Sequence, residues 1–248
     1  MLLFVRGNRG MRIDLNSTRG NKLLALLPGD DLEDVANRLE PVSLTHGLML
    51  GEEGQPIEHV YFLTEGICSV IAKTPEGARA EAGIFGYDGY IPTSAIADVD
   101  VYTYDVYVQL DAAGYRIRYD DFRHLMENRR NFLKVIIRAI EAFAVQLAYT
   151  AVSNAIHDVN ERLARWLLMC DDRIDGNELP LTHDFISMML AVRRPSVTTA
   201  LHVLEGNGFI RADRGLVTIR DRERMEQFAA DAYGKPEKAY ERLMSGLF

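Results

Sequence analysis

Cysteine is scarce in this 248-residue chain: only Cys68 and Cys170 occur, far apart and without CxxC spacing. The sequence therefore supports neither a disulfide framework nor a cysteine-ligated zinc or iron–sulfur site, and a reducing, cytoplasmic environment fits best. Long apolar runs are missing too. The run from Met1 to Val5 is too short for the core of a signal peptide, and no later segment approaches the ~20 apolar residues of a membrane span. We expect neither secretion nor membrane insertion.

Enzyme motifs are also missing. The sequence has no nucleophile elbow, P-loop, HExxH motif or glycine-rich dinucleotide turn. We interpret the paired acids Glu52–Glu53 and Asp171–Asp172 as solvated turn charges. His46 or His59 could ligate a haem, but an isolated histidine is more often an ordinary strand or surface residue. The sequence thus predicts no enzyme, no metal site and no cofactor.

Positive charge is in deficit overall, since the formal net charge is −8. That balance argues against nucleic acid, because neutralising phosphates requires Lys and Arg on the contact face. Residues 181–220 reverse it locally, with five arginines against three acids. The arginines are Arg193, Arg194, Arg211, Arg214 and Arg220; the acids are Asp184, Glu205 and Asp213.

The length accommodates two domains of ordinary size. Residues 1–20 interleave arginine with glycine and asparagine and lack an apolar period, which indicates a mobile N-terminal arm. Within residues 21–120, two short leucine-rich helices precede short β-type runs separated by glycine and proline. Such spacing is typical of a barrel or jelly roll.

Residues 121–157 contain no glycine or proline, and apolar residues recur at steps of three and four. This pattern predicts one long amphipathic helix. A small barrel alone cannot bury so long a stripe, so we expect the same helix of a second subunit as its partner. An intrachain core helix is the alternative.

Residues 158–248 hold the sharpest signal, a helix-turn-helix between Leu181 and Ile210. Thr182 can cap a first helix, and Pro195 is tolerated in the first turn of a second. The second helix should bury one apolar face and expose polar and basic residues. Two short β-type runs that meet near Arg214 then predict a β-wing. The buried set is Val197, Ala200, Leu201 and Leu204, and the exposed set is Arg194, Ser196, Thr198, Thr199 and His202.

With these features the chain resembles the Crp/Fnr (catabolite-activator-like) regulators. The resemblance covers everything beyond the N-terminal arm, and it rests on Glu52–Gly54, His59–Gly66 and above all Thr182–Ile210. It implies an α+β protein: an N-terminal double-stranded β-helix (a jelly roll like a cyclic-nucleotide-binding domain), a long dimerisation helix and a C-terminal winged helix-turn-helix. A homodimer would bind a near-palindromic site on double-stranded DNA and contact RNA polymerase.

By the same likeness, Arg194 and Thr199 stand at base-reading positions, while Thr182, Arg193 and Ser196 lie nearer the phosphates. Thr198, His202 and the wing residue Arg214 complete the predicted DNA-binding set. The family commonly has a base-reading glutamate after the recognition arginine. Pro195 stands there in this chain, so the target sequence should differ from that of the cyclic-AMP receptor.

The resemblance also implies an effector pocket, which would hold Phe85, Gly86, Asp88, Gly89, Tyr102 and Tyr104. Relatives that bind cyclic nucleotide hold its phosphate with an arginine, and none occurs between Asp98 and Gln109. Asp98, Asp100 and Asp105 would instead repel a phosphate. We therefore expect an effector other than cyclic AMP. The tyrosines could line a pocket for an aromatic effector, or they could be ordinary roll residues.

The main alternative function is a cyclic-nucleotide-binding module that acts through protein contacts.

Overall fold

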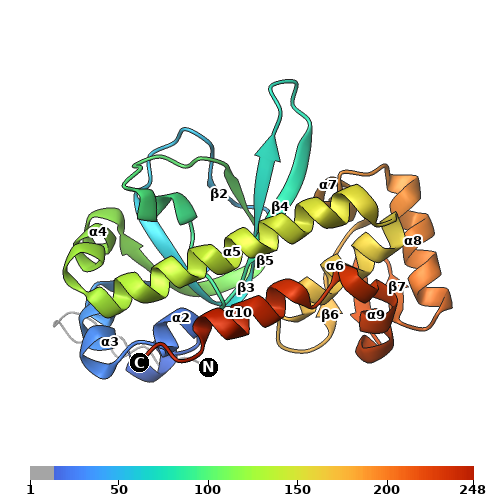
Figure 1. Cartoon of the computed structure of the whole chain (residues 1–248). Coiled ribbons are helices and arrows are strands. Elements are labelled where there is room, and N and C mark those ends of the chain that lie inside the picture. The colour runs from blue at the N-terminus through green and yellow to red at the C-terminus, as the bar shows by residue number, and fades with distance from the viewer. Residues whose placement is uncertain (1–13) are drawn as a thin grey trace.

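The computed structural model describes residues 14–248, and it places a β-rich domain along the side of one long helix and a helical domain near the C-terminal end of that helix (Figure 1). This arrangement confirms the predicted α+β fold of jelly roll, long helix and winged helix-turn-helix. The predicted arm lies outside the described residues up to position 13. From Asp14 onward the prediction of a mobile arm is wrong, because α1 (Leu15–Thr18) forms there and buries Thr18.

The β-rich domain is built around two long central strands, β3 and β5, which pair antiparallel. The strand order is β1-β5-β3-β4, and β2 pairs with β5. Gly66 has a φ of +82°, and a side chain there would overlap the backbone of Asp111 and Ala112, so only glycine fits this bend of β3. The strands are β1 (Leu39–Leu44), β2 (Met49–Gly51), β3 (His59–Lys73), β4 (Arg79–Phe85) and β5 (Asp105–Arg118).

Short helices close the ends of this roll: α2 (Lys22–Ala25) and α3 (Gly29–Ala36) come before it, and η1 (Thr93–Ala97) comes between β4 and β5. Aromatic rings fill the interior. Phe122 lies 5.6 Å from Phe132 and 5.9 Å from Tyr90 between ring centroids, and Phe62 lies 6.3 Å from Tyr90. All four rings are buried, so the roll has an apolar core of its own.

The long helical segment is not one helix as predicted but two, α4 (Tyr119–Asn128) and α5 (Arg130–Ile156). Arg129 interrupts it with φ −121° and ψ 92°. Its side chain donates from Nε to Asp34 Oδ2 on α3 at 2.8 Å, while its amide ends α4 on the Leu125 carbonyl. The break thus occurs at a residue that is neither glycine nor proline, and a tertiary ion pair accompanies it.

By length and composition alone, α5 could cross a membrane, so the expectation that no segment qualifies is wrong by that measure. Such a test is also passed by core helices of soluble proteins. One face of α5 packs on the roll through buried Phe132, Val135, Ile136 and Phe143. The opposite face leaves apolar side chains exposed, with Ile137 48% and Val152 45% accessible.

The helical domain holds α6 (Val159–Asp171), α7 (His183–Leu190), α8 (Arg194–Gly206) and α9 (Arg222–Ala229) beside a small sheet. Asp158 and Glu161 form a capping box that starts α6. The sheet order is β6-β8-β7, from Glu178–Leu179, Leu216–Ile219 and Ile210–Asp213. The core of this domain extends into the roll, because Ile67, Ile71, Ile84 and Leu110 join the same buried cluster.

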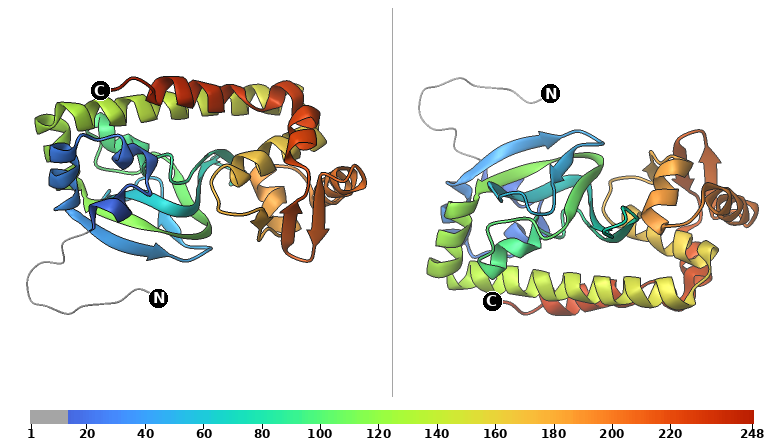
Figure 2. Two further views of the ribbon diagram at one scale, coloured as in Figure 1. Left: turned by 90° about the horizontal axis from the view of Figure 1, so that it is seen from below. Right: turned by 90° about the horizontal axis from the view of Figure 1, so that it is seen from above.

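The C-terminal helix α10 (Lys235–Met244) leaves the helical domain and runs back along α5 (Figure 2). Its buried Met244, with Leu247 just beyond, joins the core of the roll. Two cations of α5 hold the end of the chain: Arg138 donates to the Leu243 carbonyl at 2.6 Å, and Lys134 to the Leu247 carbonyl at 2.6 Å. The C-terminal segment thus connects the helical domain to the roll a second time.

Candidate nucleic-acid interface

The pair α7 and α8 forms as the sequence predicts. The Thr182 hydroxyl caps α7 by accepting from the Phe185 amide at 3.2 Å. Ala191 takes a left-handed conformation, with φ 50°, to turn the chain. Pro195 then occupies the first turn of α8, where its missing amide costs no helical hydrogen bond. Local signals therefore set the start of both helices, whereas the left-handed turn at Ala191, which is not glycine, has no such signal.

One face of α8 is buried as predicted, through Val197, Ala200, Leu201 and Leu204, none of them more than 1% accessible. This burial fixes the rotation of the helix and decides which side chains reach solvent. Ser196 and Thr198 are half-buried. The other six predicted DNA-binding residues are exposed: Thr182, Arg193, Arg194, Thr199, His202 and Arg214.

Four of these side chains line one groove, of about 650 Å³, between α7, the exposed side of α8 and the wing. They are Thr182, Arg194, His202 and Arg214. Arg193, Ser196 and Thr199 are not part of its wall; they stand elsewhere on the first turns of α8. Gly215, with φ +77°, makes the tight turn that presents Arg214 at the tip of the wing.

Two contacts within the motif modify the predicted roles. Thr198 faces His183, with its Oγ1 3.0 Å from Nδ1, so it joins α7 to α8. His183 was not predicted to take part, and only its position in the first turn of α7 could have indicated it. Arg194 lies 3.3 Å from Asp184, but both side chains are more than 60% accessible. An exposed pair of this kind is weak, so the guanidinium can exchange partners.

Comparison with known families fits this geometry. Residues 161–228 match the model of a Crp-like helix-turn-helix domain, and residues 41–129 match that of a cyclic nucleotide-binding domain. Together the two matches span more than half of the chain, in the order that the fold shows. The chain belongs to the Crp/Fnr family. It is a transcription regulator of the Crp/Fnr type with a helix-turn-helix DNA-binding domain.

Several relatives share this organisation. A CRP-like cAMP-activated global transcriptional regulator of Mycobacterium tuberculosis is 23% identical over 202 residues, which cover 79% of this chain and 90% of the relative. The c-di-GMP responsive global regulator CLP of Xanthomonas campestris has a TM-score of 0.63 at 16% identity, covering 78% of this chain and 99% of that one. TTHB099, a CRP-family regulator of Thermus thermophilus, has a TM-score of 0.63 at 18% identity, covering 76% and 96%. The names of the first two relatives mention different nucleotides, cAMP and c-di-GMP. Likeness alone therefore does not identify an effector for this chain.

Segment 85–95, which contains four of the residues predicted for an effector pocket, is packed against protein groups. Phe85 stacks on Phe143 of α5, with centroids 4.2 Å apart. A side chain at Gly89 would meet the Phe85 ring at 2.7 Å. Gln146 of α5 accepts from the Ile84 amide at 2.8 Å and donates to the Ile84 carbonyl at 3.3 Å, which fixes the edge of β4 on the helix.

The six residues predicted for an effector pocket do not share one cavity. Phe85, Asp88 and Gly89 line a cavity between the roll, α5 and α10. Tyr102 lines a different one near His59. The hydroxyl of Tyr104 is bonded to Thr93 inside the roll. Tyr102 and Tyr104 are therefore separate from the group around Asp88.

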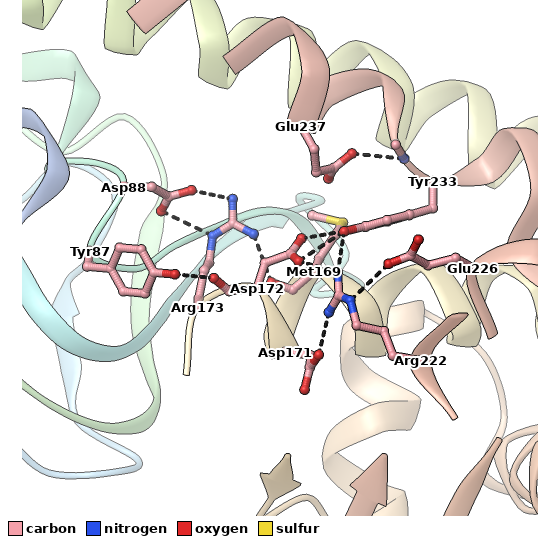
Figure 3. A network of polar contacts seen from close by, with 11 residues as sticks. Tyr87, Asp88, Met169, Asp171, Asp172, Arg173, Arg222, Glu226, Tyr233 and Glu237 are labelled. Atoms are coloured by element: carbon pink, nitrogen blue, oxygen red, sulfur yellow. Dashed lines mark hydrogen bonds and ion pairs between the residues drawn. The ribbon is translucent and has the colours of Figure 1, made fainter. Parts of the chain in front are cut away.

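Asp88 faces the helical domain, as Figure 3 shows. Its carboxylate accepts from Arg173 at 3.1 Å (Nε to Oδ1) and 2.6 Å (Nη2 to Oδ2), and also from the Gly86 amide at 3.1 Å. Arg173 is buried, and its Nη1 donates to the Met169 carbonyl at 2.8 Å. Burial alone would lower the pKa of Arg173, but Asp88 and Asp172 together raise it above its usual value. The guanidinium therefore stays charged, and it bonds the roll to the end of α6.

Asp172 is the centre of the same network. It accepts from Arg222 Nη2 at 2.5 Å and from the Tyr233 hydroxyl at 2.8 Å, while its backbone carbonyl accepts from the Tyr87 hydroxyl at 2.5 Å (Figure 3). Asp171 also pairs with Arg222. The interpretation of Asp171–Asp172 as solvated turn charges is therefore wrong, because both side chains are less than 25% accessible. Their partners lie 50 residues or more along the sequence, which no local pattern could reveal.

Proposed function

We propose that this regulator is a cytoplasmic homodimer that places two copies of α8 in successive major grooves of a near-palindromic DNA site. The single observation that supports this reading is the groove shared by Arg194, His202 and Arg214. An arginine at the start of a helix that enters the major groove can pair with a guanine, and a wing arginine can reach a phosphate. Two such helices about one helical turn apart would read a palindrome.

The second subunit is proposed from the exposed face of α5. From Ile137 to Ile156, about five and a half turns, the exposed residues of this face are apolar except Glu141 and Asn154. A continuous exposed apolar stripe marks an interaction surface, and the small alanines would let a second α5 approach closely. The exposed apolar members are Ile137, Ala144, Ala148, Ala151, Val152, Ala155 and Ile156.

We further propose that the effector is not a cyclic nucleotide and that the protein has no other cofactor. The dimer bound to DNA would also contact RNA polymerase. The packing of Phe85 on Phe143 supports the first point, because Phe85 belongs to segment 85–95, which by likeness to the family would hold the nucleotide, and the stacked rings fill space there. Arg173 is the arginine that meets this segment, and Asp88 already neutralises it. A cyclic-nucleotide phosphate would have to break that buried pair.

Selection from a random-sequence DNA pool tests the proposal. Wild-type protein should enrich a palindrome, with steep salt dependence and no requirement for cyclic AMP. Arg194→Ala should weaken binding to the selected site by about 1–3 kcal/mol and relax the preference at one base pair in each half-site. Arg242→Ala, which removes an exposed arginine of α10, is the matched control and should leave binding unchanged.

Enrichment of the same palindrome by wild type and Arg194→Ala alike would refute base reading by Arg194. Enrichment only in the presence of cyclic AMP would refute the proposal on the effector. If no sequence is enriched, with or without cyclic AMP, the purified protein does not read DNA and the proposal is refuted.

A further inference from the structure

A cavity of about 320 Å³ lies where the roll, α5, the end of α6 and the C-terminal segment meet. Phe85, Phe143, Ala139 and Pro236 give it an apolar side. The network of Figure 3 forms much of the polar side, through Asp88, Asp172, Arg173, Arg222 and Tyr233. Its volume suits a small organic molecule, and junctions between domains are common places for such sites.

Most charged groups of the polar side are already neutralised. Asp88 is paired with Arg173, and Asp172 with Arg222. Glu237 uses one carboxylate oxygen to accept from the Gly234 amide at 2.9 Å. Burial raises the pKa of Glu237, and Asp172 raises it further, so its neutral form is favoured relative to a free glutamate. Glu241 is exposed at the rim.

Two donors on the wall have no acceptor among the contacts of the described residues. The Tyr240 hydroxyl is buried without a hydrogen-bond partner. Lys22 Nζ contacts aromatic faces instead of a carboxylate, lying 4.6 Å from the centroid of Tyr87 and 6.0 Å from that of Tyr240. Lys22 comes from α2 and Tyr240 from α10, so two elements far apart in sequence bring these donors to one place. Only the Tyr240 hydroxyl is buried, so an incoming acceptor would recover free energy there, whereas Lys22 is exposed and supplies a positive charge beside it.

We propose that this junction cavity is a binding site for a small organic carboxylate, whose anionic group meets Lys22 and Tyr240 and whose apolar body packs on Phe143 and Ala139. The carboxylate accepts from both donors, and its apolar part takes the place of water against the rings. Neither residue belongs to the segment 85–95 or to the predicted DNA-binding set.

The ligand would touch α2, α5 and α10 at once, and it would lie against the Asp88–Arg173 pair. Occupancy should therefore stabilise the docked position of the helical domain. That this changes DNA affinity rests on the proposed function; binding in the cavity does not.

Calorimetric titration of the full-length protein tests the site. The probes are hexanoate, benzoate and phenylacetate, each compared with the alcohol of the same carbon skeleton. At least one carboxylate should bind at millimolar concentration or below, and its alcohol should bind at least about tenfold more weakly. Lys22→Met and Tyr240→Phe should each weaken carboxylate binding by about tenfold. Lys238→Met, at an exposed lysine of α10 outside the cavity, should leave it unchanged.

Failure of every carboxylate to bind would overturn the inference, and so would wild-type affinity in Lys22→Met or equal affinity for acid and alcohol. Folding of each variant is checked by its thermal transition, and Tyr240→Phe serves where Lys22→Met is unstable. The DNA selection is run separately on the same samples. Carboxylate binding without DNA enrichment would refute the proposed function alone, whereas DNA enrichment without carboxylate binding would refute the site alone.

Discussion

Replacing Glu81 by glutamine should abolish a large part of the pH dependence of stability. Glu81 lies on β4 and is 7% accessible. Its Oε1 accepts from the Trp166 indole at 2.7 Å, whereas its Oε2 is buried without a partner. Burial raises the pKa of Glu81 from 4.5 to about 7, although Ser69, Trp166 and nearby arginines act in the opposite direction. The site joins the roll to the first helix of the DNA-binding domain, so its titration bears on that contact.

The sign follows from which state binds the proton more tightly. Below pH 4.5 the carboxyl is protonated in both folded and unfolded chains, and its contribution to stability is complete. Between pH 4.5 and about 7 the unfolded chain loses the proton first, so the free energy of unfolding falls as pH rises, and it levels off above 7. The difference between the two pKa values corresponds to about 3 kcal/mol at most.

The single tryptophan of the chain is the donor to Glu81, so its fluorescence reports on the site directly. Urea unfolding of wild type and Glu81→Gln, followed by this emission from pH 5 to pH 8, measures the effect. The glutamine variant should lose less stability over this range and should be more stable than wild type at pH 8. Glu76→Gln, at an exposed position in the β3–β4 turn, is the control. Identical pH slopes in wild type and Glu81→Gln would refute the reasoning.

Two further changes test the interdomain pair and the helix stripe. Asp88→Asn leaves the buried Arg173 guanidinium without its carboxylate and should cost about 3 kcal/mol of unfolding free energy, measured by urea denaturation; a loss below about 1 kcal/mol would mean that the pair does not hold the domains. Ile137→Glu places a charge on the stripe proposed to face a second α5 and should raise the dimer dissociation constant at least about a hundredfold. Sedimentation equilibrium checks this, and an unchanged dimer would show that the stripe is not the interface.

The helix-turn-helix was predictable because most of its boundaries are encoded by neighbouring residues. Thr182 caps α7, Pro195 starts α8, and Gly215 turns the wing. Apolar periodicity then fixed the buried face of α8, and with it the exposed position of Arg194. Six of the eight predicted DNA-binding residues are exposed, and their exposure could be predicted without information from the rest of the chain.

The contacts between the domains were not predictable in this way. Asp88 and Arg173 lie 85 residues apart, and Arg129, at the break between α4 and α5, pairs with Asp34 of α3. Such breaks and pairs depend on tertiary geometry, and a window of sequence contains only one partner. The course of α10 was missed for the same reason. Its amphipathic pattern indicates a helix but not which surface it covers.

The return of the C-terminus to the roll determines how the DNA-binding domain can move. A domain attached only through the end of α5 could swing freely about that hinge. Here α6 follows α5 into the domain, and α10 leaves the domain along α5, with Arg138 donating to the Leu243 carbonyl in the last turn of α10. The helical domain is therefore attached to α5 twice, at its start through α6 and at its end through α10. Any reorientation must therefore slide α10 along α5 or peel it away, in addition to separating the Asp88–Arg173 pair and the apolar core that the two domains share.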